Sequence, residues 1–142
     1  MLFPIKVDYG LRLLIDLAQQ PEGVPVPATA VARRQAIPEA FVVQIFNTLQ
    51  HGGMVESRRG PRGGHMLATR PEEITVREVV ETFDRTLAPM DCLHAPEECT
   101  LSGACSQREL WSDIERVLLE ILSKTSVADL AERQRLLVSA PA

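Results

Sequence analysis

The three cysteines are the residues of this 142-residue chain best suited to chemistry, because all of them fall in one short stretch, CLHAPEECTLSGAC. Cys92, Cys99 and Cys105 are separated by six and then five residues. An odd number of cysteines cannot form a complete disulfide framework within one chain, and in a reducing compartment such thiols act as metal ligands or redox groups. Whatever this protein binds or senses is therefore expected here.

The residues around the cysteines leave more than one chemistry open. Zinc could take the three thiolates with His94 as its fourth ligand, because three cysteines and one histidine are a common structural zinc set. The thiols could also work without a metal, as a redox switch through sulfenate or disulfide formation. Inert core cysteines are disfavoured, since the stretch contains Pro96, Gly103 and two glutamates and is expected to be a loop near the surface.

The segments that must position this loop are mostly helical. Apolar residues recur with helical spacing in five segments, 6–20, 28–36, 38–51, 75–84 and 108–124. Ser126 has the sequence of a helix start, so we expect a last short helix there, followed by a frayed end in LLVSAPA. Two short strands, 54–59 and 65–68, complete a mainly α fold with a small β-hairpin.

Residues 28–51 have the pattern of a helix-turn-helix, because two helices are joined by a tight connection at residues 35–37. Once the apolar positions of the second helix face the core, its outer stripe consists of Ala40, Val43, Gln44 and Asn47. The helix before it presents Arg33 and Arg34 outward. The competing interpretation is a small helical bundle that binds no DNA.

The hairpin that follows favours DNA binding over a plain helical bundle. Its strands are joined by GPRGG, and Arg58, Arg59 and Arg62 cluster near this turn. Arginines on a narrow tip can enter a minor groove and neutralise phosphates, which makes the hairpin a wing; a solvated hairpin with idle arginines is the alternative. Residues 1–72 carry a net charge of +2 and residues 73–142 carry −6, and such asymmetry favours nucleic-acid contact by the first half.

Residues 108–124 form the longest uninterrupted helical pattern. Its apolar residues recur at a coiled-coil-like spacing, at Leu110, Ile114, Val117 and Ile121, with Trp111, Leu118 and Leu122 widening the stripe. This apolar surface predicts pairing with a second copy of the chain, and burial against the first helix of the same chain is compatible with it. We therefore divide the chain into a winged helix-turn-helix DNA-binding domain (1–84), the cysteine loop (85–107), and a long dimerisation helix with a C-terminal segment (108–142).

A specific order of segments carries a family resemblance. YGLRLLIDLA, IPEAFVVQIFNTLQHGGMV, RRGPRGGHMLA and EEITVREVVE are followed by the three cysteines and then by Leu110-Trp111. On these residues the chain resembles the Rrf-two family of bacterial winged helix-turn-helix regulators, from residue 1 to about residue 134. The resemblance implies a homodimeric transcriptional repressor that pairs through the long helix and binds a pseudo-palindromic operator in double-stranded DNA. It also implies that Ala40, Val43 and Gln44 face the major groove and that Arg59 reaches the minor groove.

The resemblance further implies an iron–sulfur cluster, 2Fe-2S or 4Fe-4S, on the three cysteines, which senses nitric oxide, iron or redox state. In the cluster-assembly branch of the family a histidine three residues after the last cysteine is the fourth ligand, and this chain has Arg108 there. In the nitric-oxide-sensing branch the other subunit donates an aspartate, which corresponds to Asp8. The chain is thus closer to the nitric-oxide-sensing or iron-responsive branches. Asp8 is also a residue type that the dipole of a helix favours in its first turn.

Enzymatic activity and membrane insertion are both disfavoured. The three histidines, His51, His65 and His94, are dispersed and pair with no nucleophile, and neither a phosphate-binding glycine motif nor Cys-x-x-Cys is present. No apolar run approaches the roughly 18–20 residues that a bilayer needs, and the first residues lack a basic leader, so we expect a cytoplasmic protein. A regulator that binds only a partner protein is the remaining alternative to DNA binding.

Overall fold

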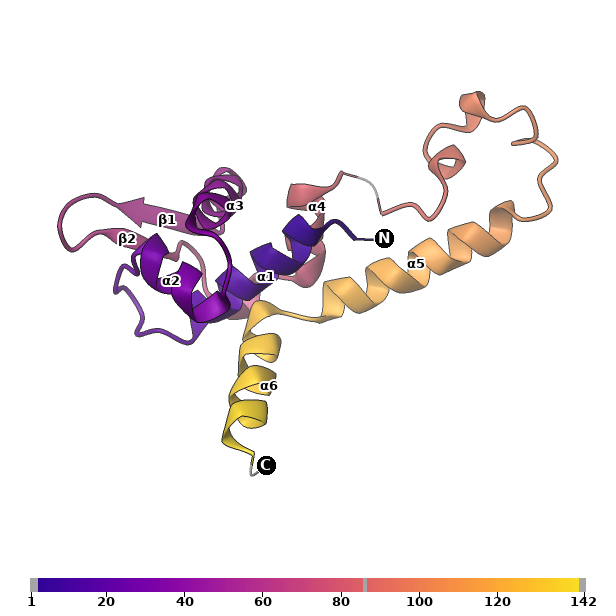
Figure 1. The fold of residues 1–142 in the computed structure, drawn as a ribbon. Coiled ribbons are helices and arrows are strands. Elements are labelled where there is room, and N and C mark those ends of the chain that lie inside the picture. Colours follow the sequence, from indigo (N-terminus) through magenta and orange to yellow (C-terminus); the bar gives the residue numbers. More distant parts are fainter. Residues whose placement is uncertain (1–2, 86, 141–142) are drawn as a thin grey trace.

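The computed structural model describes residues 3–85 and 87–140. Within them lie six α-helices and one two-stranded antiparallel sheet, with bounds α1 Ile5–Ala18, α2 Ala28–Gln35, α3 Glu39–His51, β1 Val55–Arg58, β2 Gly64–Leu67, α4 Val76–Phe83, α5 Arg108–Lys124 and α6 Val127–Ser139. Figure 1 shows α1 to α4 and the hairpin gathered as a head, from which α5 extends to the cysteine loop, while α6 turns off in another direction. The predicted mainly α fold with a small hairpin is confirmed.

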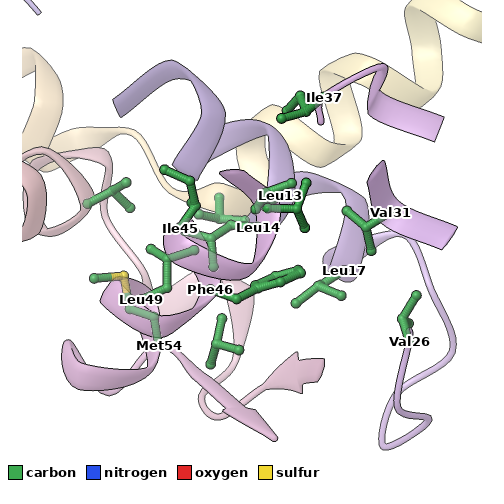
Figure 2. Close-up of a cluster of buried hydrophobic side chains, with 14 of the residues drawn as sticks. Leu13, Leu14, Leu17, Val26, Val31, Ile37, Ile45, Phe46, Leu49 and Met54 are labelled. Carbon is green, nitrogen blue, oxygen red and sulfur yellow. The ribbon is translucent and has the colours of Figure 1, made fainter. Parts of the chain in front are cut away.

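The head is held together by one apolar cluster between α1 and α3. Leu13, Leu14, Phe46 and Leu49 have no exposed surface, and Val31 of α2 joins them (Figure 2). Leu13 and Leu14 are adjacent in α1, and Phe46 and Leu49 lie three positions apart in α3, so each helix turns one apolar face inward and leaves most of its polar residues outside. Burying a side chain of this size stabilises the fold by about 1.5–3 kcal/mol, and this packing fixes α3 against α1.

The hairpin lies where the sequence predicts it, and each strand end is shifted by one residue. Val55 pairs with Leu67, and Arg58 pairs with Gly64. The hairpin is anchored to the segment before α2, because His65 and Val26 exchange two backbone hydrogen bonds of 2.8 Å. A side chain at Gly64 would approach the Val26 carbonyl to 2.4 Å, at a φ of +155° that also favours glycine, so this crossing requires glycine.

The start of α6 belongs to the same body as the head. Ser126 and Thr75 each begin a helix with a capping box, and the amide of the fully buried Val127 donates to the carbonyl of Ile74 at 2.8 Å. The expected start of a last helix at Ser126 is confirmed, whereas the expected fraying of LLVSAPA is wrong up to Ser139, where α6 ends; residues 141 and 142 lie outside the described residues. The capping box supplies partners for the first amides of α6, and most residues after it are strong helix formers.

The remaining predicted helices are found with ends that shift by at most two residues. The division of the chain at residues 84 and 107 stays a prediction. The C-terminal α6 packs along α1 of the head, where Gln19 Nε2 donates to the carbonyl of Ala131 at 3.4 Å. In the part of the chain that the structure describes, no helix is both long and apolar enough to cross a membrane.

Candidate DNA-binding face and cysteine loop

The outer face of α3 is the surface that the helix-turn-helix leaves open. Its predicted contact residues are all exposed: Ala40, Val43, Gln44 and Asn47. Phe41, which the predicted contact residues do not include, is also exposed, by 53 %. In the helical pattern Phe41 falls outside the core positions, and an aromatic side chain left in solvent beside an exposed stripe is the signal that points to it.

Side chains fix the wing against α3. The imidazole ring of His65 in β2 stacks on Phe46 of α3 with the ring centroids 4.2 Å apart. Ser57 of β1 donates a hydrogen bond of 2.7 Å to the side-chain oxygen of Gln50. Burial lowers the pKa of His65 below its ordinary value of 6.5, so near neutral pH the ring is uncharged and packs as an aromatic group. The wing and the outer face of α3 are therefore held in one arrangement.

The arginines of the wing are available to a ligand. Arg58, Arg59 and Arg62 are exposed, and none of them forms an ion pair with any residue in the described ranges. The turn between them is closed by a hydrogen bond of 2.9 Å from the amide of Gly63 to the carbonyl of Gly60. Three unpaired cations on a narrow tip make a protrusion that suits phosphates and a DNA groove.

The two arginines at the end of α2 differ in their surroundings. Arg33 is exposed and has no ion-pair partner among the residues that the structure describes. Arg34 instead donates to both carboxylate oxygens of Asp16 on α1, at 2.7 and 3.0 Å, and this hydrogen bonding raises the pKa of its guanidinium above the ordinary value. A DNA contact by Arg34 stays a prediction. Asp16 gives no signal in the sequence, because a lone acidic residue on an amphipathic helix is ordinarily solvated.

The cysteine loop lies at the end of α5 that points away from the head (Figure 1). Cys92 lies in a short 3-10 turn, Asp91–Leu93, Cys99 follows a second turn, Pro96–Glu98, and Cys105 precedes α5. All three thiols are free and half-buried. Across the described residues, no three His, Cys, Asp or Glu side chains are grouped so that they could hold a metal ion. The donor set is chemically suited to a metal or a cluster, but the loop must change shape before three sulfur atoms could share one.

Two contacts tie the loop to α5. Arg108 donates from Nη1 to the backbone carbonyl of Cys92 at 3.1 Å, and Nε2 of His94 lies 2.6 Å from a carboxylate oxygen of Glu115. The Glu115 side chain is only 16 % exposed. His94, the candidate zinc ligand, is thereby engaged by a carboxylate of α5. Spacing in the sequence gave no signal for either contact, since each joins residues at least sixteen positions apart.

Asp8 lies in the first turn of α1, as predicted, and its side chain is 61 % exposed. Its carboxylate is 3.9 Å from the guanidinium of Arg12. The beginning of α1 lies apart from the cysteine loop of the same chain (Figure 1). The structure therefore does not bring Asp8 and the three cysteines together within one chain, and a role for Asp8 as a ligand requires a second copy.

α5 carries apolar residues on two opposite sides. Leu119 and Leu122 pack on the head, with a small cluster that contains Val7. The residues of the predicted stripe on the other side are 42–58 % exposed, namely Leu110, Ile114, Val117 and Ile121. Trp111 and Leu118, between the two sides, are half-buried. The stripe is thus uncovered in a single chain, while Leu122, which was expected to widen it, faces the head.

The chain matches one known family over most of its length. The family model Rrf2, described as an iron-dependent transcriptional regulator, matches residues 4–133. The chain belongs to the Rrf2 family. As a member of that family it is a DNA-binding transcriptional regulator, and the named proteins that it resembles are regulators rather than enzymes.

Relatives of this Rrf2 chain carry different names. The regulator IscR of Aliivibrio salmonicida is 31 % identical over 125 residues, which cover 88 % of this chain and 74 % of that protein. The regulator CymR of Bacillus subtilis is 29 % identical over 126 residues, which cover 89 % of this chain and 86 % of that protein. The family resemblance inferred from the sequence is confirmed. The names of these relatives do not decide which signal this chain senses.

Solved structures of both kinds share the fold of this Rrf2 chain. The structure of CymR, the global cysteine regulator of B. subtilis, has a TM-score of 0.78 at 28 % identity and covers 92 % of this chain and 96 % of its own. The structure of T. potens IscR also has a TM-score of 0.78, at 24 % identity, and covers 98 % of this chain and 92 % of its own. The latter likeness supports the fold alone.

Proposed function

We propose that this Rrf2-family chain is a homodimeric repressor whose affinity for operator DNA depends on an iron–sulfur cluster in its cysteine loop. The observation that carries the proposal is the position of three free, half-buried thiols on one irregular loop joined directly to α5. Thiolates are the principal protein ligands of such clusters, and a loop without helical geometry can bring three of them together. The description of the family as iron-dependent supports this choice.

In this proposal the head of each copy reads one half of the operator. The outer stripe of α3 enters the major groove, where the amide of Gln44 offers both a donor and an acceptor to a base edge. The apolar Ala40 and Val43 beside it suit contact with the methyl group of thymine. The wing arginines and Arg33 contact phosphates and the minor groove, which fixes the position of the head on the duplex.

The exposed stripe of α5 pairs in this proposal with the same stripe of a second copy. Such an isologous contact covers Ile114 and Val117 of both chains and sets the distance between the two heads. The half-sites of an operator lie one helical turn of DNA apart, or a multiple of it, so a small change in the spacing of the heads lowers affinity. The dimer face is therefore where the state of the loop can act on DNA binding.

Cys92, Cys99 and Cys105 would hold the cluster, with Asp8 of the second copy as a fourth ligand. When bound, the cluster supplies a site whose reduction potential and stability respond to its ligands and its solvent exposure. A change in the shape of the loop would reach α5 through two contacts, the bond of Arg108 to the Cys92 carbonyl and that of His94 to Glu115. A hundredfold change in operator affinity needs only about 2.7 kcal/mol of such coupling.

The test is the metal content of protein purified without oxygen. We expect iron and acid-labile sulfide in matching amounts and a brown chromophore in the wild type, and loss of both in Cys99→Ala. Asp8→Ala should change the visible spectrum or lower the iron content, whereas Glu22→Ala, which removes another exposed carboxylate, should not. Iron binding is read directly, so the result does not depend on knowing the operator.

Two outcomes of that experiment would replace the iron–sulfur cluster by another interpretation of the cysteine loop. Zinc without sulfide would identify a structural metal site on the same cysteines, with His94 released from Glu115 as a fourth ligand. Neither metal, even after anaerobic reconstitution, would identify a thiol switch that works through sulfenate or disulfide chemistry. Either alternative requires free thiols, and all three cysteines are free.

A further inference from the structure

Asp16 is the one buried charged residue among those that the structure describes, with 2 % of its surface exposed. A buried carboxylate is tolerated only when it is paired and hydrogen-bonded. All of the side chains that donate to it come from the end of α2. Arg34 donates through Nη2 at 2.7 Å and through Nε at 3.0 Å, one bond to each carboxylate oxygen, and Gln35 Nε2 donates to Oδ2 at 3.0 Å. Asp16 thus joins α1 to the last two residues of α2.

Arg12, one helical turn before Asp16 on α1, holds the same end of α2. Its guanidinium donates to the backbone carbonyl of Gln35 and, at 3.3 Å, to the side-chain oxygen of Gln35. The last carbonyls of a helix have no partner inside the helix, so Arg12 supplies a donor that α2 lacks. α1 therefore contacts the end of α2 at two points, through the carboxylate of Asp16 and through the guanidinium of Arg12.

The end of α2 determines where α3 begins. Ala36 has a left-handed backbone conformation (φ 53°, ψ 44°), and the amide of Ile37 returns to the carbonyl of Ala32 at 3.1 Å. Pro38 then caps α3, so only two residues separate α2 from that cap. A left-handed backbone is unfavourable for a residue other than glycine, and such a turn persists only when its surroundings hold it.

We infer that the Asp16–Arg34 ion pair is a positioning lock that sets the direction of the DNA-reading helix α3, and that Arg34 serves this lock instead of contacting phosphate. Two nitrogen atoms of its guanidinium are already committed to Asp16. Its neighbour Arg33 is then the phosphate contact of α2. The inference rests on the proposed reading of DNA by the outer face of α3.

The substitution Asp16→Asn distinguishes the two possible roles of Arg34, because each role predicts an opposite change in affinity for the specific duplex. It removes a buried negative charge that cannot itself touch DNA, and it replaces one of the two acceptors of Arg34 by an amide NH2 group, so the guanidinium loses its ion pair and one of its two bonds. If Arg34 contacts phosphate, the variant binds DNA more tightly and with a steeper salt dependence, because it has gained a free cation. The lock predicts that affinity for the specific duplex falls by about tenfold, the scale of one lost base-pair contact, while affinity for unrelated DNA does not fall.

The probes are a duplex selected from a randomised pool by the wild-type chain and a scrambled duplex of the same composition. Both dissociation constants are measured by fluorescence anisotropy at several salt concentrations, below the thermal midpoint of each variant. Selection by the wild type tests DNA reading by itself. An Asp16→Asn protein that keeps the wild-type ratio of specific to non-specific affinity overturns the lock alone.

A matched pair of lysine variants decides the question if Asp16→Asn does not stay folded. Arg34→Lys and Arg135→Lys both keep their positive charge, and lysine binds phosphate well, but it cannot form the two parallel bonds of the guanidinium fork, which Arg135 makes to Glu132 on the exposed α6. The lock predicts a lower ratio of specific to non-specific affinity for Arg34→Lys and a wild-type ratio for Arg135→Lys. Equal ratios in the two variants contradict it.

Discussion

The head of this molecule differs from its arm, the part that consists of α5 and the cysteine loop, in how much of it is buried. In the head, α1 and α3 bury Leu13, Leu14 and Phe46 completely, and the ion pair of Asp16 fixes the turn between α2 and α3. α5 has no buried residue, and the three cysteines are only half-buried. The proposed DNA-reading surface is therefore positioned within one chain, whereas the exposed stripe of α5 and the three thiols have no such packing within one chain.

The largest expected effect comes from the core of the head. Phe46→Ala removes a fully buried ring that also supports His65 of the wing, and should lower the free energy of unfolding by about 3–5 kcal/mol. Leu101→Ala, at a side chain of the cysteine loop that is 65 % exposed, should change it by less than about 0.5 kcal/mol. Urea unfolding followed by circular dichroism measures both. Similar decreases in the free energy of unfolding for the two variants would contradict the claim that the head is packed more tightly than the loop.

The next effect tests the uncovered stripe of α5. Ile114→Arg places a charge in the centre of the proposed dimer contact, which a desolvated apolar interface does not tolerate. The variant should sediment as a monomer at concentrations where the wild type is a dimer, with its circular dichroism spectrum unchanged. Ser112→Arg adds the same charge on the same helix outside the stripe and should leave the dimer intact. A dimeric Ile114→Arg protein would place the interface elsewhere.

The smallest expected effect concerns pH and the contact between wing and α3. Burial lowers the pKa of His65 in the folded chain, so below the unfolded value of about 6.5 the unfolded state takes up a proton first. The stability due to neutral His65 is thus fully present above about pH 6.5 and is lost as the pH falls through the folded pKa. His65→Phe keeps the ring on Phe46 and removes this group.

The measurement compares free energies of unfolding at pH values from about 7.5 down to about 5.5, above the range in which most carboxylates titrate. The advantage of His65→Phe over the wild type should grow as the pH falls. His51→Gln removes an exposed histidine and serves as the control. A constant difference between His65→Phe and the wild type across this range would show that His65 is not titrating with folding.

Much of the fold and part of the site could be predicted from the sequence, because periodic patterns and clustered residue types are local signals. The helical spacing located α5 to the residue, and the arginines in and next to the GPRGG turn indicated the wing. The bond of Asp16 to Arg34 and that of His94 to Glu115 join distant segments, and no spacing rule reports them. The same limit applies to Leu122, whose side of α5 is decided by where α4 packs.

The most direct test of the central claim is the affinity of the chain for its selected duplex in two states of the loop. Wild-type protein is prepared without oxygen, once with iron and sulfide and once after chelation, and Cys99→Ser is treated in the same way. We expect the two wild-type preparations to differ by about a hundredfold in dissociation constant, equivalent to about 2.7 kcal/mol of coupling, and the two Cys99→Ser preparations to have the same dissociation constant. Equal affinities in the two wild-type preparations would contradict the claim that the cysteine loop controls the head.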